Sequence, residues 1–166
     1  MIYFLSLGSN LDDPVRQLAR ARTCIGSRVG PVRKCSSLYR TEPVGFRRQP
    51  WFLNQVLEVE SALSPRQLLF AIKAIERTMK RAPGPRNGPR RIDIDILLAE
   101  DVVLRTGELT VPHPGLPARA FVLVPLAEIA PRRRHPVLRH TIAALRRTCP
   151  DRSRVIRLPG TRGGAG

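Results

Sequence analysis

The sequence predicts an α+β fold in which helices pack on a mostly antiparallel β-sheet. Residues 52–60 and 92–98 alternate apolar and polar side chains with the period of a half-buried strand, and 1–7 is a short apolar run. Asp13-Pro14 and Ser64-Pro65 each combine a capping residue with a proline at the first helical position. With one more strand before residue 52, the order β-α-β-β-α-β predicts a ferredoxin-like sandwich with extra strands and helices after it.

The first half of the chain supplies most of these elements. A helix is expected from Pro14 to about Ile25, a second strand from Val32 to Tyr39, and an irregular loop over 40–50. The strand 52–60 has two faces, one with Leu53, Gln55, Leu57 and Val59 and the other with Phe52, Asn54, Val56 and Glu58. The helix after Ser64 has a buried stripe of Leu68, Leu69, Ile72, Ile75 and Met79.

The second half continues with shorter elements. Short strands are expected at Val102–Leu104 and Leu109–Val111, and helices over Ala118–Ala130 and Thr141–Thr148. No internal repeat or linker is visible, so residues 1–158 are expected to form one domain that buries a core without disulfides or metals. The Gly-rich end, 159–166, is expected to be disordered.

Composition limits the class of protein. A net charge of +16 predicts anionic partners such as nucleotides, nucleic acid or a membrane surface, although nearly all of the 29 basic residues are arginine, which a GC-rich genome also favours. Cys24, Cys35 and Cys149 are an odd number without metal-ligand spacing, which argues against a disulfide scaffold or a zinc site. No apolar run of about 18 residues and no basic leader is present, so we expect a cytoplasmic protein without a membrane span.

The strand 92–98 carries the strongest functional pattern. Its apolar side chains, Ile92, Ile94, Ile96 and Leu98, share one face, and Asp93 and Asp95 share the other. Two carboxylates roughly 7 Å apart repel each other unless solvent or a cation screens them. Oxygen ligands of this kind suit Mg²⁺ together with substrate phosphates, which the neighbouring Arg90 and Arg91 would also bind. Taken alone, Asp-x-Asp more often marks a strand with two solvated charges, but the isoleucine face behind the pair favours a site.

Three further features bear on the ligand. Phe52 and Asn54 lie on one face of their strand, and an aromatic ring beside an amide suits a flat heterocycle that forms hydrogen bonds, although strand phenylalanines belong more often to the core. The segment 80–91 contains three prolines, two glycines and five basic residues, so it is expected to be irregular and to close over an anionic substrate. His113 taken alone is more often a structural or solvated histidine.

Five segments in order resemble the 6-hydroxymethyl-7,8-dihydropterin pyrophosphokinase family, over roughly residues 2–131. They are Leu7-Gly8-Ser9-Asn10-Leu11, Ser37-Leu38-Tyr39-Arg40-Thr41-Glu42-Pro43, Phe52-Leu53-Asn54, Gly88-Pro89-Arg90-Arg91-Ile92-Asp93-Ile94-Asp95, and Val111-Pro112-His113-Pro114 through Arg119-Ala120-Phe121. The resemblance implies an ATP-dependent diphosphotransferase of folate biosynthesis. Such an enzyme moves the pyrophosphoryl group of ATP onto 6-hydroxymethyl-7,8-dihydropterin and releases AMP.

The resemblance also implies residue roles. Asp93 and Asp95 match the ligands of two Mg²⁺ ions that bridge the ATP phosphates, and Arg81 and Arg90 match basic residues that neutralise the transferring phosphates. The pterin-binding positions are Thr41, Pro43, Val44, Phe52, Asn54 and Phe121. The nucleotide-side positions are Lys73, Glu76, Thr110, His113 and Arg119.

Two departures from the family pattern concern the segment before Gly88. Many members carry tryptophan where this chain has Asn87, so a lid contact made by that indole is absent. The loop from Arg81 to Asn87 is also shorter than in some relatives, which leaves open whether Arg81 or Arg86 contacts phosphate.

Two other functions would account for parts of this sequence. A nucleic-acid-binding module fits the charge, but no RNP1-type aromatic segment is present, and the aspartate pair would repel a phosphate backbone without metal. A two-carboxylate hydrolase or nuclease explains the aspartates and leaves Phe52, Asn54 and the Thr-Glu-Pro loop unused. We therefore expect ATP and a reduced hydroxymethylpterin as partners, and neither nucleic acid nor a membrane.

Overall fold

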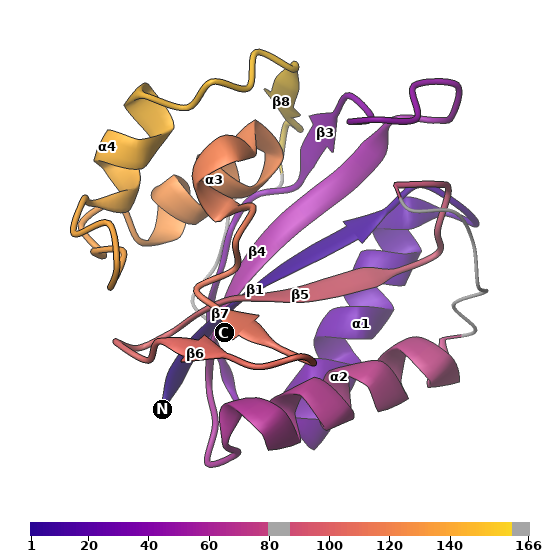
Figure 1. The fold of residues 1–166 in the computed structure, drawn as a ribbon. Helices are drawn as coiled ribbons and strands as arrows, with labels where there is room; N and C mark the ends of the chain where they lie inside the picture. The colour runs from indigo at the N-terminus through magenta and orange to yellow at the C-terminus, as the bar shows by residue number, and fades with distance from the viewer. Residues whose placement is uncertain (80–86, 161–166) are drawn as a thin grey trace.

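A computed structural model of the protein describes residues 1–79 and 87–160, and its centre is a six-stranded antiparallel sheet (Figure 1). The strands are β1 (Ile2–Ser9), β2 (Val32–Cys35), β3 (Tyr39–Thr41), β4 (Phe52–Glu60), β5 (Asp93–Ala99) and β8 (Val155–Arg157). Their order is β5-β1-β4-β3-β8, with β2 also paired to β4. β6 (Leu104–Arg105) and β7 (Thr110–Val111) form a separate two-stranded pair.

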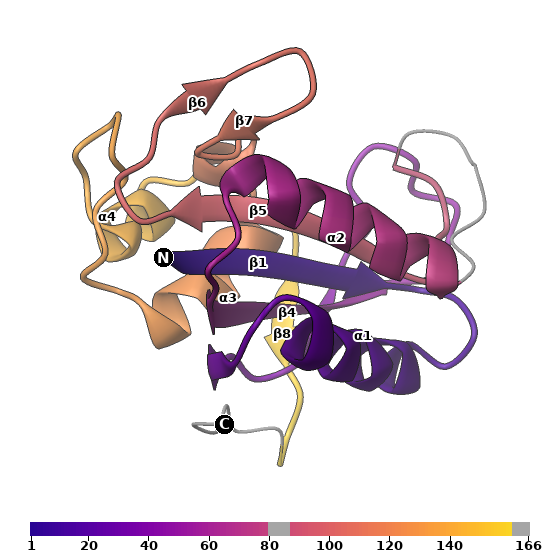
Figure 2. The same ribbon diagram turned by 90° about the horizontal axis from the view of Figure 1, so that it is seen from below.

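Helices cover both faces of the sheet (Figures 1 and 2). On one face, α1 (Pro14–Arg28) and α2 (Pro65–Thr78) complete the expected β-α-β-β-α-β sandwich. The other face carries the 3-10 helix η1 (Leu116–Ala118), α3 (Ala120–Ile129) and α4 (Ile142–Arg147), which form a second layer. Two apolar cores result, one under α1 and α2 and one that includes Phe4, Val56 and Leu123. α3 is apolar on nearly every side, which is why it packs within this second core.

The helix starts follow the capping residues expected from the sequence. The Asp13 carboxylate accepts a hydrogen bond from the backbone N–H of Arg16, and Pro14 opens α1. Ser64 and Gln67 form a reciprocal capping box at the start of α2. These local contacts fix where each helix leaves the sheet.

The strand register brings three site residues to one end of the sheet. β1 lies between β4 and β5, and Gly8 pairs with Asn54 on one side and with Asp93 on the other. Ser6 pairs with Asp95. Because alternate residues of a strand share a face, Asn54, Asp93 and Asp95 lie on the same face of the sheet, around Ser6 and Gly8.

A bulge in β5 changes the face of the sheet on which Leu98 lies. Phe4 pairs with Leu98 and Leu5 pairs with Ile96, so Leu97 has no partner residue on β1. Ile96 packs in the core under α1 and α2, whereas Leu98 packs in the core under α3 and α4. The expectation that Leu98 shares a face with Ile96 is therefore wrong.

Other boundaries also differ from the expected ones. The single strand expected from Val32 to Tyr39 is two strands, β2 and β3, and both pair with β4. The register of β2 on β4 shifts between Val32 and Lys34. The strand expected at Val102–Leu104 begins only at Leu104. β8 was not expected from the sequence, and it extends the sheet beyond β3.

Two expectations fall wholly or mainly on residues that the structure does not describe. The irregular, closing segment 80–91 is described only from residue 87, and the disordered end 159–166 only to residue 160. Among the described helices, none is long and apolar enough to cross a membrane.

Candidate active site

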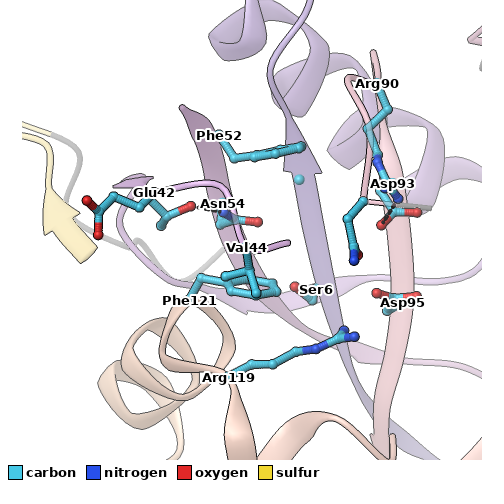
Figure 3. A pocket seen from close by; sticks show the side chains of 13 residues that line it. Ser6, Glu42, Val44, Phe52, Asn54, Arg90, Asp93, Asp95, Arg119 and Phe121 are labelled. Carbon is cyan, nitrogen blue, oxygen red and sulfur yellow. Dashed lines mark hydrogen bonds and ion pairs between the residues drawn. The ribbon is translucent and has the colours of Figure 1, made fainter. Parts of the chain in front are cut away.

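A cavity of about 120 Å³ opens at the end of the sheet where β1, β4 and β5 meet the loop after β3 and the start of α3 (Figure 3). Nine of the residues predicted from the sequence line it: Thr41, Val44, Phe52, Asn54, Arg90, Asp93, Asp95, Arg119 and Phe121. The other lining residues are Ser6, Gly8, Glu42 and Asn87. The fold thus gathers positions more than a hundred residues apart into one site.

Two aromatic rings form opposite walls of the cavity. Figure 3 shows Phe52, from β4, and Phe121, from the first turn of α3, on opposite sides of the space, with Asn54 between them at the back. Both phenylalanines are half-buried rather than enclosed in a core. A planar ligand entering between them would stack on an aromatic face on each side.

The amide of Asn54 is oriented by one hydrogen bond and lies close to the backbone of β1. Its Nδ2 donates a hydrogen bond to Thr41 Oγ1 at 2.6 Å, and the residue as a whole is 5% exposed. A Cβ atom added to Gly8, directly opposite on β1, would lie 2.8 Å from Asn54 Oδ1. Glycine at position 8 therefore gives the amide the room to lie in the cavity.

The acidic end of the cavity contains Asp93 and Asp95, whose side chains are 25% and 38% exposed. Arg90 Nη1 donates to Asp93 Oδ2 at 2.8 Å, and His113 Nε2 lies 4.0 Å from Asp95 Oδ2. Among the described residues, no group of three or more His, Cys, Asp or Glu side chains could hold a metal ion. Asp93 and Asp95 are therefore a pair of carboxylates at this end of the cavity, without a third acidic or histidine side chain beside them among the described residues that would complete a metal site.

His113 is neutral near neutral pH. Burial and the nearby Arg119 guanidinium lower its pKa to about 4, against the opposing pull of Asp93. The backbone N–H of Gly115 donates to His113 Nδ1 at 3.0 Å, so in the neutral ring Nε2 carries the proton. This N–H donor faces Asp95.

Arg119 extends from the start of α3 toward the acidic end (Figure 3). Its guanidinium lies 5.7 Å from the ring centroid of Phe121. A Cβ atom on Gly115 would lie 2.6 Å from Arg119 Nε, so the side chain packs directly over that glycine. Arg119 and Arg90 thus bring positive charge to both sides of the aspartate pair.

The remaining predicted residues lie outside this cavity. Pro43 is a buried residue of the loop after β3, and Lys73 is exposed on α2. Glu76, also on α2, is 7% exposed and accepts a hydrogen bond from the backbone N–H of Ile94, between the two aspartates. Thr110 and His113 line a second cavity of about 290 Å³ next to β7. Arg81 lies outside the described residues.

Four lining residues had no role assigned from the sequence, although Gly8 and Glu42 stand in segments that resemble the family. Asn87 was noted as a departure from the family pattern, and it lines the cavity in a left-handed backbone conformation with φ 61°. Ser6 and Gly8 become lining residues through the β1–β5 and β1–β4 registers. Glu42 lines the cavity while its carboxylate turns away to accept a hydrogen bond from the backbone N–H of Arg154 (Figure 3). No local pattern could show these placements.

The site combines two facing phenylalanines and a fixed amide with an end that carries two aspartates and two arginines. Such a combination is typical of a kinase-type transferase. Residues 4–131 match the model of the 7,8-dihydro-6-hydroxymethylpterin-pyrophosphokinase (HPPK) family, and the chain belongs to that family. It has the pyrophosphokinase activity of that family, which serves folate biosynthesis.

Individual relatives agree with this assignment. The chain is 41% identical to the 2-amino-4-hydroxy-6-hydroxymethyldihydropteridine pyrophosphokinase of Aquifex aeolicus, over 82% of this chain and 84% of that protein. It is 41% identical to the enzyme of the same name from Pseudomonas aeruginosa, over 95% and 96%. It is 43% identical to the folic acid synthesis protein fol1 of Schizosaccharomyces pombe, but spans only 19% of that longer protein.

A solved structure shares the fold. The crystal structure of wild-type Plasmodium falciparum HPPK-DHPS with pteroate superposes with a TM-score of 0.74. The match covers 89% of this chain and 42% of that chain, at 18% sequence identity. The expected α+β architecture is confirmed.

Proposed function

We propose that the cavity between Phe52 and Phe121 binds the pterin ring of 6-hydroxymethyl-7,8-dihydropterin, and that its acidic end takes the phosphates of ATP with Mg²⁺. The observation that carries this proposal is the lining of one cavity by the aromatic pair, the Asn54 amide and the Asp93/Asp95 pair. A heterocycle in the slot would direct its hydroxymethyl group toward the carboxylates. The acceptor oxygen and the phosphates then meet in one place.

At the pterin end, binding rests on stacking and on a few fixed hydrogen bonds. Phe52 and Phe121 supply the two aromatic faces, and Asn54 offers an amide that is already oriented by Thr41. We assign the edge of the ring to backbone groups of Thr41 and Val44, which line the cavity, and of Pro43, which is buried in the same loop. Such preorganised polar groups give a pterin an advantage over an apolar ring of the same size.

At the phosphate end, the charged side chains neutralise the transferring group. Arg90 uses one N–H on Asp93 and one on Gly88 O, so its remaining donors are available to phosphate oxygens. Arg119 approaches from the opposite side, and the neutral His113 presents an Nε2–H. We assign Arg90 and Arg81 to the catalytic group, and Lys73, Glu76, Thr110, His113 and Arg119 to the nucleotide.

The residues present fit Mg²⁺. Two carboxylates on one strand face, without a third protein ligand among the described residues, match an ion that is usually held by one or two carboxylates and substrate phosphates. Asp93 and Asp95 would hold two such ions when ATP is bound. Bound Mg²⁺ would neutralise part of the phosphate charge.

The chain's own contribution to the reaction is positioning and charge. The pterin hydroxymethyl oxygen loses its proton to solvent and forms a bond to the β-phosphorus of ATP. The bond from that phosphorus to the α,β-bridging oxygen breaks, and AMP leaves with this oxygen. The phenylalanine walls hold the acceptor in line, and Arg90 stabilises the charge that builds on the transferring oxygens.

The direct test is nucleotide analysis after incubation with ATP, Mg²⁺ and reduced 6-hydroxymethylpterin. We expect AMP and a pterin diphosphate in equal amounts, and no AMP when the pterin is omitted. Formation of ADP, or loss of ATP without pterin, would contradict the proposal.

A further inference from the structure

Asn10 follows the last residue of β1, and its hydrogen bonds are not used by the function proposed above. The residue is 4% exposed. Its side-chain Oδ1 accepts from the backbone N–H of Arg90 at 2.9 Å, and its own backbone N–H donates to Arg90 O at 3.1 Å. Its Nδ2 donates to Gln49 Oε1 and to Pro50 O, each at 2.9 Å. The amide is therefore fully engaged.

The two contacts to Arg90 hold both polar backbone groups of that residue. From this fixed backbone, the guanidinium donates to Gly88 O at 3.2 Å and to Asp93 Oδ2 at 2.8 Å. Arg90 stands in a segment without helix or strand, where no regular hydrogen-bond ladder would hold it. Asn10 supplies the anchor that regular structure supplies elsewhere.

The two contacts to Gln49 and Pro50 reach the loop that carries Val44 into the cavity. Gln49 Nε2 donates to Phe46 O within the loop at 2.6 Å, and to Asn87 O at 2.5 Å. The Asn87 amide lies 2.9 Å from the point where a Cβ of Gly45 would stand, and Gly45 has a φ of 82°. The loop and the segment that leads to Arg90 therefore touch through Gln49 and through this glycine.

We propose that Asn10 is a positioning residue. It orients Arg90 toward the transferring phosphates and, through Gln49, connects Arg90 to the loop after β3 that carries Val44. The pterin end and the phosphate end of the cavity are then held as one unit. An asparagine is needed because the site requires an acceptor toward Arg90 and two donors toward carbonyl oxygens. Aspartate would instead place an anionic oxygen against Gln49 Oε1 and Pro50 O. The inference rests on the proposed role of Arg90.

The first test is the kinetics of Asn10→Ala. We expect kcat to fall roughly 10- to 100-fold, because a small misplacement of a catalytic group has effects of this order, and the KM for pterin to rise. Gln67→Ala is the matched control, since it removes another structural amide, in the capping box of α2, away from the cavity. It should lower the melting temperature and leave kcat and both KM values unchanged. Asn10→Ala kinetics that resemble the control would overturn the inference.

A double-mutant cycle with Arg90→Ala distinguishes failure of the proposed role of Asn10 from failure of the proposed role of Arg90. If Asn10 acts through Arg90, the double variant should have nearly the kcat of Arg90→Ala alone. If the two losses multiply fully, Asn10 does not act through Arg90, and the inference fails while the role of Arg90 stands. If Arg90→Ala alone keeps its kcat, the proposed role of Arg90 fails, and the inference fails with it.

A variant of Gln49 covers the case in which Asn10→Ala does not fold. Gln49→Met keeps the length of a half-buried loop side chain and removes the acceptor for Asn10 Nδ2 together with both of its own donors. If Gln49 acts through Arg90, the variant that combines Gln49→Met with Arg90→Ala should have nearly the kcat of Arg90→Ala alone. A Gln49→Met enzyme with unchanged kcat and unchanged pterin KM would refute the link between the loop and Arg90.

Discussion

Replacing Gly8 with alanine tests how closely β1 is fitted to the Asn54 amide, which we propose binds the pterin. The new Cβ would stand 2.8 Å from Asn54 Oδ1, whereas ordinary contact begins at 3.4 Å. Asn54 must therefore move by about 0.6 Å. Gly8 itself lies in a strand, so alanine causes no backbone strain there. The effect of the substitution falls on the opposing side chain.

The size of the effect follows from the hydrogen bonds that Asn54 would lose. Its 2.6 Å bond to Thr41 Oγ1 would stretch or break, and in the complex its bond to the pterin would also be weakened. An unmade hydrogen bond of a buried polar group costs about 1–3 kcal/mol. We expect the affinity for a pterin analogue to fall roughly 5- to 150-fold.

The assay is calorimetric titration of Gly8→Ala with a pterin analogue and, separately, with a non-hydrolysable ATP analogue and Mg²⁺. Nucleotide affinity should change little. Gly26→Ala is the control, because Gly26 lies in α1 with nothing within 4 Å of the added Cβ, and alanine there should slightly stabilise the helix. Unchanged pterin affinity in Gly8→Ala, or an equal loss for both ligands, would refute the reasoning.

Two further predictions concern the aromatic wall and a buried histidine. Phe121→Ala should remove one aromatic face of the slot and weaken pterin binding by about 1–3 kcal/mol, while the affinity for ATP changes little. Calorimetry that shows an equal loss of affinity for both ligands would mean that Phe121 belongs to the core. Burial lowers the pKa of His135, whose Nδ1 accepts from the backbone N–H groups of Val137 and Leu138. The unfolded chain therefore binds a proton first as the pH falls below about 6.5, and stability that is full above that pH is lost with acidification. His135→Asn keeps an acceptor at the δ1 position, so urea unfolding should show a shallower fall in stability below pH 6.5 than in the parent; identical slopes would contradict this.

Much of the fold was predictable because the strands alternate cleanly. Both faces of β4 are as expected, since Leu57 packs under α1 and α2 while Val56 packs on the opposite side. The bulge at Leu97 could not be predicted, because residues 96–99 are all apolar and a skipped position leaves no mark on such a run.

β8 was missed for a different reason. It is three residues long, and contacts distant in sequence hold it against β3. Arg157 Nε donates to Ser37 Oγ at 2.9 Å, and its Nη2 lies 3.6 Å from Glu128 Oε1. Local propensity carries no information about such partners.

The candidate site was predictable where one strand holds several of its residues. The periodicity of β4 and β5 alone paired Phe52 with Asn54, and Asp93 with Asp95. Phe121 came only from the resemblance to the family, because a phenylalanine at the start of an apolar helix has no local mark of function. The roles of all these residues stay predictions until they are measured.

The aspartate pair is the centre of the proposed function, and Asp95→Asn tests it most directly. The substitution keeps the shape of the side chain and removes one charge from the cavity that would hold Mg²⁺ and the ATP phosphates. The surface variant Asp101→Asn, at a side chain that is 91% exposed, makes the same chemical change outside the cavity.

The deciding measurement is the rate of AMP formation by Asp95→Asn at saturating ATP, pterin and Mg²⁺, beside the melting temperature in a chelator. We predict that Mg²⁺-dependent nucleotide binding falls, that turnover falls further because charge neutralisation matters most in the transition state, and that Asp101→Asn does neither. The melting temperature without metal should stay unchanged or rise slightly, because one of two repelling carboxylates is lost. Near-normal turnover, or unfolding of the metal-free variant, would show that Asp95 belongs to the scaffold and would contradict the proposed site.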